Sequence, residues 1–247
     1  MKMVQNSHQD IQTVKPDQAK EKNIMEFMLD TADTKAIKDL DKLLSIDGVT
    51  TNPTIITKSG KDPEQAIADI ISILRPEQKM FVQVVSTDYD GIMAEARKIS
   101  ALRPENMYVK IPVTRAGLMA IKQCAKEGIH TLATAIYSAA EGYLAAANGA
   151  DYLAPYVNRI CNYTDGVAEV VRLLNMLSAN NMKARVIAAS FKNANQVNEL
   201  IENGIQAVTV APDVVTQMYN HPATELAVEE FTENWDKAYG RKTLFGE

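Results

Sequence analysis

The chain has 247 residues, of which 46% are apolar and 23% charged, and its formal net charge is −5. This composition is typical of a globular protein with one large or two small domains, and the acidic balance excludes general attraction to nucleic acid or to an anionic membrane surface. No stretch approaches the roughly 18 consecutive apolar residues of a membrane span, and the first ten residues lack the apolar core of a secretory signal.

The cysteines and histidines bear on the cellular compartment and on the possibility of a metal site. Cys124 and Cys161 are the only cysteines, which favours a reducing, cytoplasmic compartment over a disulfide framework. The three histidines, His8, His130 and His221, are scattered and have no metal-ligand spacing. We therefore predict no structural metal site.

The chain begins with a polar segment and then becomes periodic. Residues 1–24 are rich in Lys, Gln and Asp with little periodicity, which predicts a polar extension. From Met25 onward, short β-branched runs alternate with segments of helical period, and we expect residues 25–247 to form a single domain. The predicted strands are 27–30, 48–51, 80–86, 107–113, 131–136, 151–157, 184–190 and 206–211, and the predicted helices are 33–44, 63–74, 89–101, 115–127, 138–148, 166–180, 192–202 and 212–219.

The repeat of these units predicts the fold class. Eight strand–helix units follow one another at intervals of about 26 residues, as an α/β (β/α)₈ barrel requires. An open, doubly wound sheet would show the same alternation, because counting units does not reveal whether the sheet closes. The eightfold repeat favours the barrel.

A further helix is predicted beyond the eighth unit, over residues 222–239. Val228, Phe231, Trp235 and Tyr239 recur along it at helical spacing. This apolar stripe packs either on the helix's own barrel or on a neighbouring subunit, and the residues alone do not decide between the two.

Polar side chains stand at the carboxyl ends of the predicted strands, where barrel enzymes build their sites. In chain order they are Asp30, Asn52, Gln83, Lys110, Thr134, Tyr156 with Arg159, and Ser190. Each has a structural alternative: Asp30 and Asn52 could cap helices, Thr134 and Ser190 could form caps or turns, Gln83 could satisfy backbone groups, and Arg159 could pair with a carboxylate.

Helix capping and ion pairing could account for the other strand-end residues, but they do not account for Lys110. It stands inside the strand-forming run MYVKIPVT, at positions 107–114. Burial disfavours the charged ammonium and lowers the pKa of a lysine, which supplies a neutral amine able to attack a carbonyl. The alternative is a lysine whose stem lies along the strand end while its amine reaches solvent.

Several segments resemble the transaldolase family. These are GVTTNPTII (48–56), YVKIPVTRAGLMAIK (108–122), TLATAIYSAAEGYLAAANGADYLAPYVNRI (131–160) and AASFKN (188–193). The resemblance runs from about Met25 to Arg241 and is strongest to the short bacterial branch of the family, the fructose-6-phosphate aldolases. It implies a (β/α)₈ barrel in which Lys110 forms the Schiff base.

The resemblance also implies roles for the other strand-end residues. Tyr156 matches the acid/base tyrosine of the aldolase branch, where transaldolases carry phenylalanine. Gln83 matches that branch's glutamine and would hold the catalytic water together with Thr134, while Asp30 matches the aspartate near the substrate hydroxyls. The residues implied to bind substrate are Asn52 and Ser190 for the sugar, Arg159 for the phosphate, and Lys192 as a helper for the phosphate.

The function implied by this resemblance is a reversible, lysine-dependent aldol cleavage. Fructose 6-phosphate or a similar ketose phosphate would give dihydroxyacetone and glyceraldehyde 3-phosphate, with neither cofactor nor metal, because the iminium serves as the electron sink. The alternative is a transaldolase that transfers the dihydroxyacetone unit between sugar phosphates of the pentose phosphate pathway. A more distant alternative is a barrel that binds sugar phosphates without turnover. A phosphosugar isomerase would need a Glu or His at a strand end, and none is found there.

The resemblance implies partners as well. They are small sugar phosphates and further copies of the same chain, in a ring pentamer or a stacked decamer. In such rings the last helix docks on the adjacent subunit, which favours that alternative for residues 222–239. Neither nucleic acid nor a membrane is expected as a partner.

Overall fold

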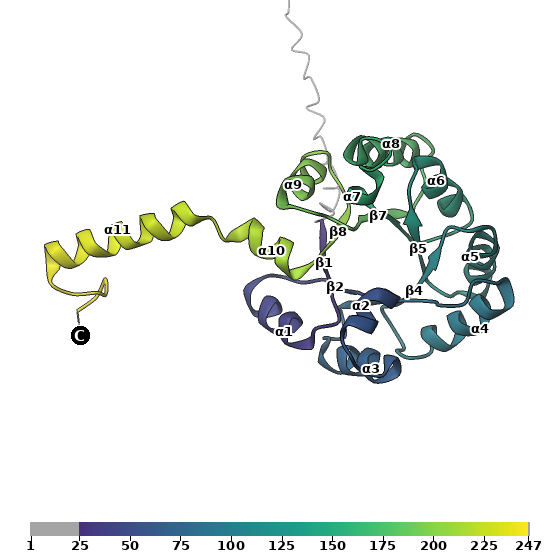
Figure 1. The fold of residues 1–247 in the computed structure, drawn as a ribbon, viewed down its shortest axis with the longest axis horizontal. Helices are drawn as coiled ribbons and strands as arrows, with labels where there is room; N and C mark the ends of the chain where they lie inside the picture. The colour runs from purple at the N-terminus through teal and green to yellow at the C-terminus, as the bar shows by residue number, and fades with distance from the viewer. Residues whose placement is uncertain (1–24, 247) are drawn as a thin grey trace, which may run out of the picture.

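Eight parallel strands close into a barrel in the computed structural model, which describes residues 25–246. The strands follow one another around the barrel in sequence order, and β8 pairs with β1. Figure 1 shows the ring of strands surrounded by helices. The predicted (β/α)₈ barrel is confirmed, and pairing between the first and last strands excludes the open sheet.

The boundaries of the elements follow closely from the sequence pattern. The strands are β1 Glu26–Asp30, β2 Gly48–Thr50, β3 Lys79–Gln83, β4 Met107–Pro112, β5 Thr131–Ile136, β6 Tyr152–Pro155, β7 Arg185–Ala188 and β8 Ala207–Val210. The helices are α1 Thr34–Leu43, α2 Pro53–Lys58, α3 Pro63–Ile73, α4 Tyr89–Ser100, α5 Arg115–Glu127, α6 Ala139–Ala147, α7 Val157–Ile160, α8 Gly166–Ala179, α9 Ala194–Glu202, α10 Pro212–Tyr219 and α11 Pro222–Tyr239. The polar extension predicted for residues 1–24 lies outside the described residues.

Two short helices, α2 and α7, were not predicted. Both occupy loops at the carboxyl ends of strands, after β2 and β6. Asn52 begins α2, with its Oδ1 accepting from the amide of Ile55 at 2.9 Å and Pro53 in the first turn. A helix of one or two turns shows too few apolar positions for its period to be read from the sequence.

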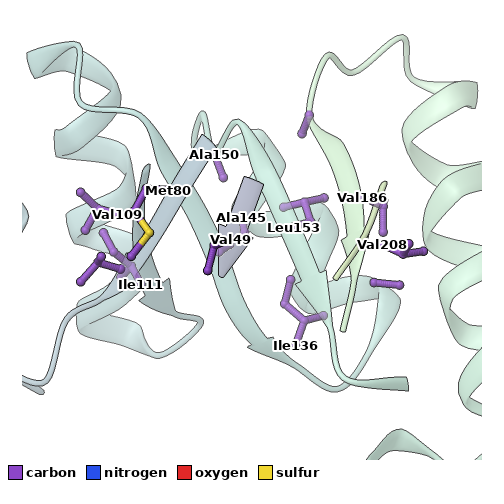
Figure 2. Packing of buried hydrophobic residues seen from close by; sticks show 14 of the residues in the cluster. Val49, Met80, Val109, Ile111, Ile136, Ala145, Ala150, Leu153, Val186 and Val208 are labelled. Carbon is purple, nitrogen blue, oxygen red and sulfur yellow. The ribbon is translucent and has the colours of Figure 1, made fainter. Parts of the chain in front are cut away.

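Side chains of the strands alternate between two apolar clusters. The outer cluster lies between the strands and the surrounding helices, and Figure 2 shows part of it, including Val109 and Ile111 of β4. The inner cluster fills the barrel with Met28, Phe81, Leu132, Tyr152 and Ile187 among others. Since neighbouring residues of a strand face opposite sides, Lys110, between Val109 and Ile111, faces the barrel interior.

Aromatic rings fill the lower part of the barrel interior. Phe81 stacks on Tyr108 with ring centroids 4.8 Å apart, and Tyr152 meets both rings edge-on at 5.5 and 5.2 Å. These rings lie below Lys110 and Gln83 along their strands, because Tyr108 and Phe81 precede them by two residues. Among the described residues the barrel is therefore packed beneath its polar carboxyl end, and that end is where barrel enzymes bind their ligands.

The last helix projects away from the barrel, as Figure 1 shows. None of the residues of α11 is buried, and Phe231 is 68% exposed. Within the described residues, the ring of Trp235 meets only side chains of its own segment, with Tyr239 at 4.5 Å and Arg241 over its ring at 5.9 Å. The alternative in which this stripe packs on its own barrel is wrong. Among the described helices, α11 included, none is long and apolar enough to cross a bilayer.

Candidate active site

The carboxyl ends of the strands bring the predicted polar residues to one end of the barrel. Asp30 pairs with Thr50, Gln83 with Lys110, and Pro112 with Thr134 in the registers of β1–β2, β3–β4 and β4–β5. Residues far apart in the sequence thus become neighbours around the ring. The polar groups that follow β6 and β7 join them through the pairing of Tyr156 with Ala189.

Lys110 is buried in the upper barrel and is 3% exposed. Burial lowers the pKa of its amine, and the negative charge of Asp30 partly opposes this effect. No carboxylate lies within ion-pair distance of its Nζ in the described part of the chain. The alternative of a lysine that reaches solvent is wrong, and the site can offer a neutral amine as a nucleophile.

Asp30 is held by a pair of threonines from neighbouring strands. Thr50 donates to Oδ1 of Asp30 at 2.7 Å, and the Thr50 hydroxyl also lies 2.6 Å from that of Thr209. Burial raises the pKa of Asp30, while the charge of Lys110 is the largest influence in the opposite direction. Asp33, and not Asp30, caps α1, so the capping alternative for Asp30 is wrong.

The hydroxyl of Tyr156 lies 3.0 Å from Oγ1 of Thr134, and either can donate. Burial raises the pKa of Tyr156, although the hydrogen bond with Thr134 opposes the shift. The phenol therefore stays protonated at neutral pH and can donate or relay a proton. Thr134 lies within strand β5 and caps no helix, since Ser138 begins α6.

Gln83 carries an unsatisfied polar atom. Its Oε1 is buried and has no hydrogen-bond partner among the described residues. Buried polar atoms of folded proteins nearly always have a partner, so this oxygen is available to a ligand or a water. The amide lies beside Lys110 in the sheet register.

A cavity of about 700 Å³ opens at this end of the barrel. Asp30, Asn52 and Arg159 lie on its wall, and they come from β1, the start of α2 and α7. Asn52 both caps α2 and faces this cavity, so its two predicted roles are compatible. The cavity wall also includes Thr54, Lys58 and Lys61, which were not singled out in the sequence.

Arg159 stands exposed beside Tyr156 and has no carboxylate partner in the ion pairs of the described residues. Its guanidinium carbon lies 5.0 Å from the centre of the Tyr156 ring. The alternative in which Arg159 serves as an ion-pair partner is therefore not supported. The exposed cation is available to an anion at the mouth of the cavity.

Ser190 and Lys192 follow β7 and do not line this cavity. Ser190 has a left-handed backbone with φ of +61°, and its carbonyl accepts from the amide of Asn158 at 2.9 Å. The side chain of Lys192 is exposed, and Asn193 rather than Lys192 begins α9. Substrate contacts of Ser190 and Lys192 stay predictions.

Three residues of the site were missed in the sequence. Thr50 and Thr209 face Asp30, and Tyr137 meets the ring of Tyr156 edge-on at 6.0 Å. Alternation along GVTT could have placed Thr50 inside the barrel, whereas the position of Tyr137 depends on an irregularity of β5. No group of three metal-ligating side chains exists in residues 25–246.

The fold and the site define an enzyme of the (β/α)₈-barrel class, with its candidate centre at the carboxyl ends of the strands. Comparison with known proteins gives the family. The model of the transaldolase/fructose-6-phosphate aldolase family matches residues 27–243, and the chain belongs to that family.

One curated relative and one solved structure illustrate these similarities. A protein of Streptococcus pneumoniae (strain ATCC 700669 / Spain 23F-1), described as a probable fructose-6-phosphate aldolase, is 41% identical over 213 residues, which is 85% of this chain and 96% of the relative. A cube-shaped, porous protein cage designed by fusing symmetric oligomeric domains matches with a TM-score of 0.51 and 14% identity, over 87% of this chain and 77% of the cage chain. The likeness to the cage concerns the fold alone.

Proposed function

We propose that this enzyme is a lysine-dependent aldolase that cleaves fructose 6-phosphate, or a similar ketose phosphate, to dihydroxyacetone and glyceraldehyde 3-phosphate. The observation that carries the proposal is the burial of Lys110 beside Asp30, at the same end of the barrel as the hydrogen-bonded pair Tyr156 and Thr134. The Streptococcus pneumoniae relative, described as a probable fructose-6-phosphate aldolase, supports the same activity.

The reaction begins at the amine of Lys110. Its lone pair attacks the C2 carbonyl of the open-chain ketose, and loss of water gives an iminium. Asp30 lies near the amine and carries charge of opposite sign, which favours the cationic iminium. Burial of Lys110 supports this role because it disfavours the charged ammonium and so increases the share of neutral amine before attack.

Tyr156 handles the proton in the cleavage step. A base takes the proton of the C4 hydroxyl, the C3–C4 bond breaks, and its electron pair moves into the iminium to leave an enamine. We assign the proton transfer to Tyr156, whose protonated phenol acts as a relay together with a water held by Gln83 and Thr134, and the proton lost from the C4 hydroxyl is returned to C3 when the enamine is protonated. The 3.0 Å contact of Thr134 with Tyr156 and the unpaired Oε1 of Gln83 support that arrangement.

The enamine then has two fates. Protonation and hydrolysis release dihydroxyacetone and regenerate Lys110, which is the aldolase outcome. Attack on a second aldehyde gives a new ketose phosphate, which is the transaldolase outcome. Tyr156 favours the first fate, because it supplies a proton donor next to the enamine.

Arg159 is the proposed binding group for the substrate phosphate, with Asn52 and Ser190 on the sugar and Lys192 as a helper. The absence of an ion-pair partner for Arg159 within the described residues supports this assignment, because an unneutralised guanidinium binds phosphate oxygens well. Asn52 lies on the cavity wall together with Arg159.

We also propose that the enzyme is a cytoplasmic homo-oligomer. Cys124 and Cys161 are both free thiols, which supports a reducing compartment. The unpartnered apolar residues of α11 support docking of this helix on a neighbouring copy, in the pentamer or decamer that the family resemblance implies.

The first experiment measures release of glyceraldehyde 3-phosphate from fructose 6-phosphate, without and then with erythrose 4-phosphate. Release without an acceptor supports the aldolase. Silence until the acceptor is added identifies a transaldolase, and binding without turnover in both conditions identifies a non-catalytic barrel.

Borohydride trapping tests the nucleophile directly. Reduction in the presence of substrate should attach one ketose to each wild-type chain and none to Lys110→Ala, which should also be inactive. Circular dichroism of the variant provides the control for folding. Unchanged trapping in Lys110→Ala would refute the assignment.

A further inference from the structure

Tyr137 occupies a position in the site for which the sequence predicted no role. Its ring meets Tyr156 at 6.0 Å and an angle of 61°, and meets Tyr163 on another side at 6.2 Å and 79°. The neighbouring Tyr137 side chain is the largest influence that raises the pKa of Arg159. Tyr137 thus packs against the proposed acid/base residue and lies beside the proposed phosphate-binding residue.

An irregularity of β5 brings Tyr137 to this place. Leu132 belongs to the cluster inside the barrel, whereas Ile136 belongs to the outer cluster, although residues four apart in a regular strand face the same side. The register shifts between Ala133 and Ile136, and Ala135 has a φ of +56°. This bulge inverts the alternation, so the residue after Ile136 faces the mouth of the barrel.

The backbone of Tyr137 is anchored on the helix that follows. Its amide donates to Oε2 of Glu141 at 2.7 Å, and the same oxygen accepts from the amide of Ser138 at 3.0 Å. Ser138 and Glu141 form a capping box at the start of α6. The ring of Tyr137 therefore projects from a fixed point, between the rings of Tyr156 and Tyr163.

Arg159, by contrast, has little of its own to hold it. It lies on α7, a helix of four residues, and its side chain is exposed. A free arginine side chain populates many rotamers, and binding an anion would have to restrict them. Its guanidinium lies over the face of the Tyr156 ring at 5.0 Å, and Tyr137 packs against the same ring at 6.0 Å, close enough to affect the pKa of Arg159.

We propose that Tyr137 is a positioning residue, which holds Arg159 over the ring of Tyr156 and so fixes the substrate phosphate relative to the reacting carbons. The proposal rests on the proposed function, because it assigns the phosphate to Arg159. Tyr137 acts through Arg159 and donates no proton to the substrate. Its removal should therefore affect phosphorylated substrates selectively.

The test compares two acceptors in the synthetic direction, with dihydroxyacetone as the donor. In Tyr137→Phe, which keeps the ring and loses the hydroxyl, kcat/KM for glyceraldehyde 3-phosphate should fall by about three- to tenfold relative to unphosphorylated glyceraldehyde. The loss should appear in KM, with kcat within about twofold of the wild type. Tyr163→Phe is the matched control, because it removes a tyrosine hydroxyl on the other side of Tyr137. An unchanged ratio in Tyr137→Phe, or an equal fall in Tyr163→Phe, overturns the proposal.

A double-mutant cycle separates positioning from a general loss of order. If Tyr137 acts through Arg159, Tyr137→Phe should have no further effect on the acceptor ratio in an Arg159→Leu background. A full additional effect in that background would show an independent action and would also overturn the proposal.

Binding of inorganic phosphate, measured by calorimetry, tests the proposal without turnover. Tyr137→Phe should weaken phosphate binding by about three- to tenfold, and Tyr163→Phe should not. An inactive wild-type enzyme would refute the proposed function and leave this difference measurable. An unchanged phosphate affinity in Tyr137→Phe, or no phosphate binding by the wild type, overturns the role of Tyr137 whatever the activity.

Discussion

At the scale of single residues, Lys110 and Asp30 share a buried site in which each affects the other's charge. Burial lowers the pKa of the amine and raises that of the carboxyl, and each group's charge opposes the shift of its neighbour. Because the charge of each group alters the pKa of the other, the two titrations are linked. The pH dependence of the reaction should therefore report on both.

Asp30→Asn should move the acid limb of kcat/KM to lower pH. Lys110 attacks only as a neutral amine, so the acid limb follows the deprotonation of Lys110. The negative charge of Asp30 raises the pKa of Lys110. Removing the charge lowers that pKa further. Asp39→Asn, an exposed change on α1, is the control and should leave the limb in place. A limb that stays, or moves to higher pH, in Asp30→Asn would contradict the coupling.

Tyr156→Phe should shift the enzyme from cleavage towards transfer. Without the phenol, the enamine loses its nearby proton donor and survives longer, so a second aldehyde captures it more often. The measurement is the ratio of free dihydroxyacetone to transfer product with erythrose 4-phosphate present. Thr134→Val, which removes the hydroxyl that contacts Tyr156 at 3.0 Å, should change the ratio in the same direction but less. An unaltered ratio in Tyr156→Phe counts against proton delivery by this residue.

The two thiols should differ sharply in reactivity. Burial raises the pKa of Cys124 to about 11, whereas Cys161 is exposed. Because the thiolate is the reactive form, the native protein should release one equivalent of thionitrobenzoate with Ellman's reagent and a second only after denaturation. Cys161→Ser is the control and should remove the fast equivalent. Two fast equivalents in the native protein would contradict the buried position of Cys124.

At the scale of elements, a charged cluster ties four strands together at the end of the barrel opposite the site. Oε1 of Glu26 in β1 lies 3.2 Å from Nζ of Lys79 in β3 and 2.9 Å from Nη1 of Arg185 in β7. Its Oε2 accepts from the hydroxyl of Tyr152 in β6 at 2.8 Å. Polar groups at this end of a barrel contribute to stability rather than to catalysis.

Glu26→Gln should destabilise the barrel by about 2–4 kcal/mol, because it leaves two largely buried cations without their carboxylate. Urea unfolding followed by circular dichroism measures the change. The control is Asp39→Asn, which breaks an exposed pair with Lys35 and should leave the midpoint of urea unfolding nearly unchanged. If the two substitutions changed the free energy of unfolding equally, the charged cluster would not contribute specially to the stability of the barrel.

At the scale of the whole molecule, α11 is a helix that does not pack on the barrel. Its apolar side chains include Leu226, Val228, Phe231 and Tyr239, and all four are more than half exposed. An apolar face of this kind, carried on an arm outside the barrel, is typical of an interface between subunits.

Phe231→Asp should therefore reduce the assembly without unfolding the barrel. A charge in the middle of the apolar face opposes burial against a second copy, while the side chain contacts nothing buried in its own chain. Sedimentation equilibrium measures the molar mass, and Glu230→Gln on the same helix is the control. An unchanged oligomer, or a wild type that sediments as a monomer, would contradict docking through α11.

The sequence by itself determined the elements and their order, because these depend on interactions between residues close together in the chain. Alternation in runs such as MYVKIPVT and helical period in segments such as 115–127 place strands and helices within a few residues of their observed ends. Eight such units predicted the barrel, and Lys110 stood out because a lysine within a buried strand is costly. The family resemblance then linked these positions to a chemistry.

Tertiary structure alone decided what each side chain meets. Asp30 accepts from Thr50, which is 20 residues away in the chain, and Thr50 contacts Thr209, which is 159 residues away from it; only barrel closure brings the three residues together. The bulge at Ala135 inverts the alternation and turns Tyr137 to the site, against the local pattern. The outward course of α11 likewise was not decided by its helical spacing, which is compatible with packing on its own barrel as well. Such contacts depend on closure of the barrel and on packing between distant segments. The pattern of neighbouring residues in the sequence therefore does not predict them.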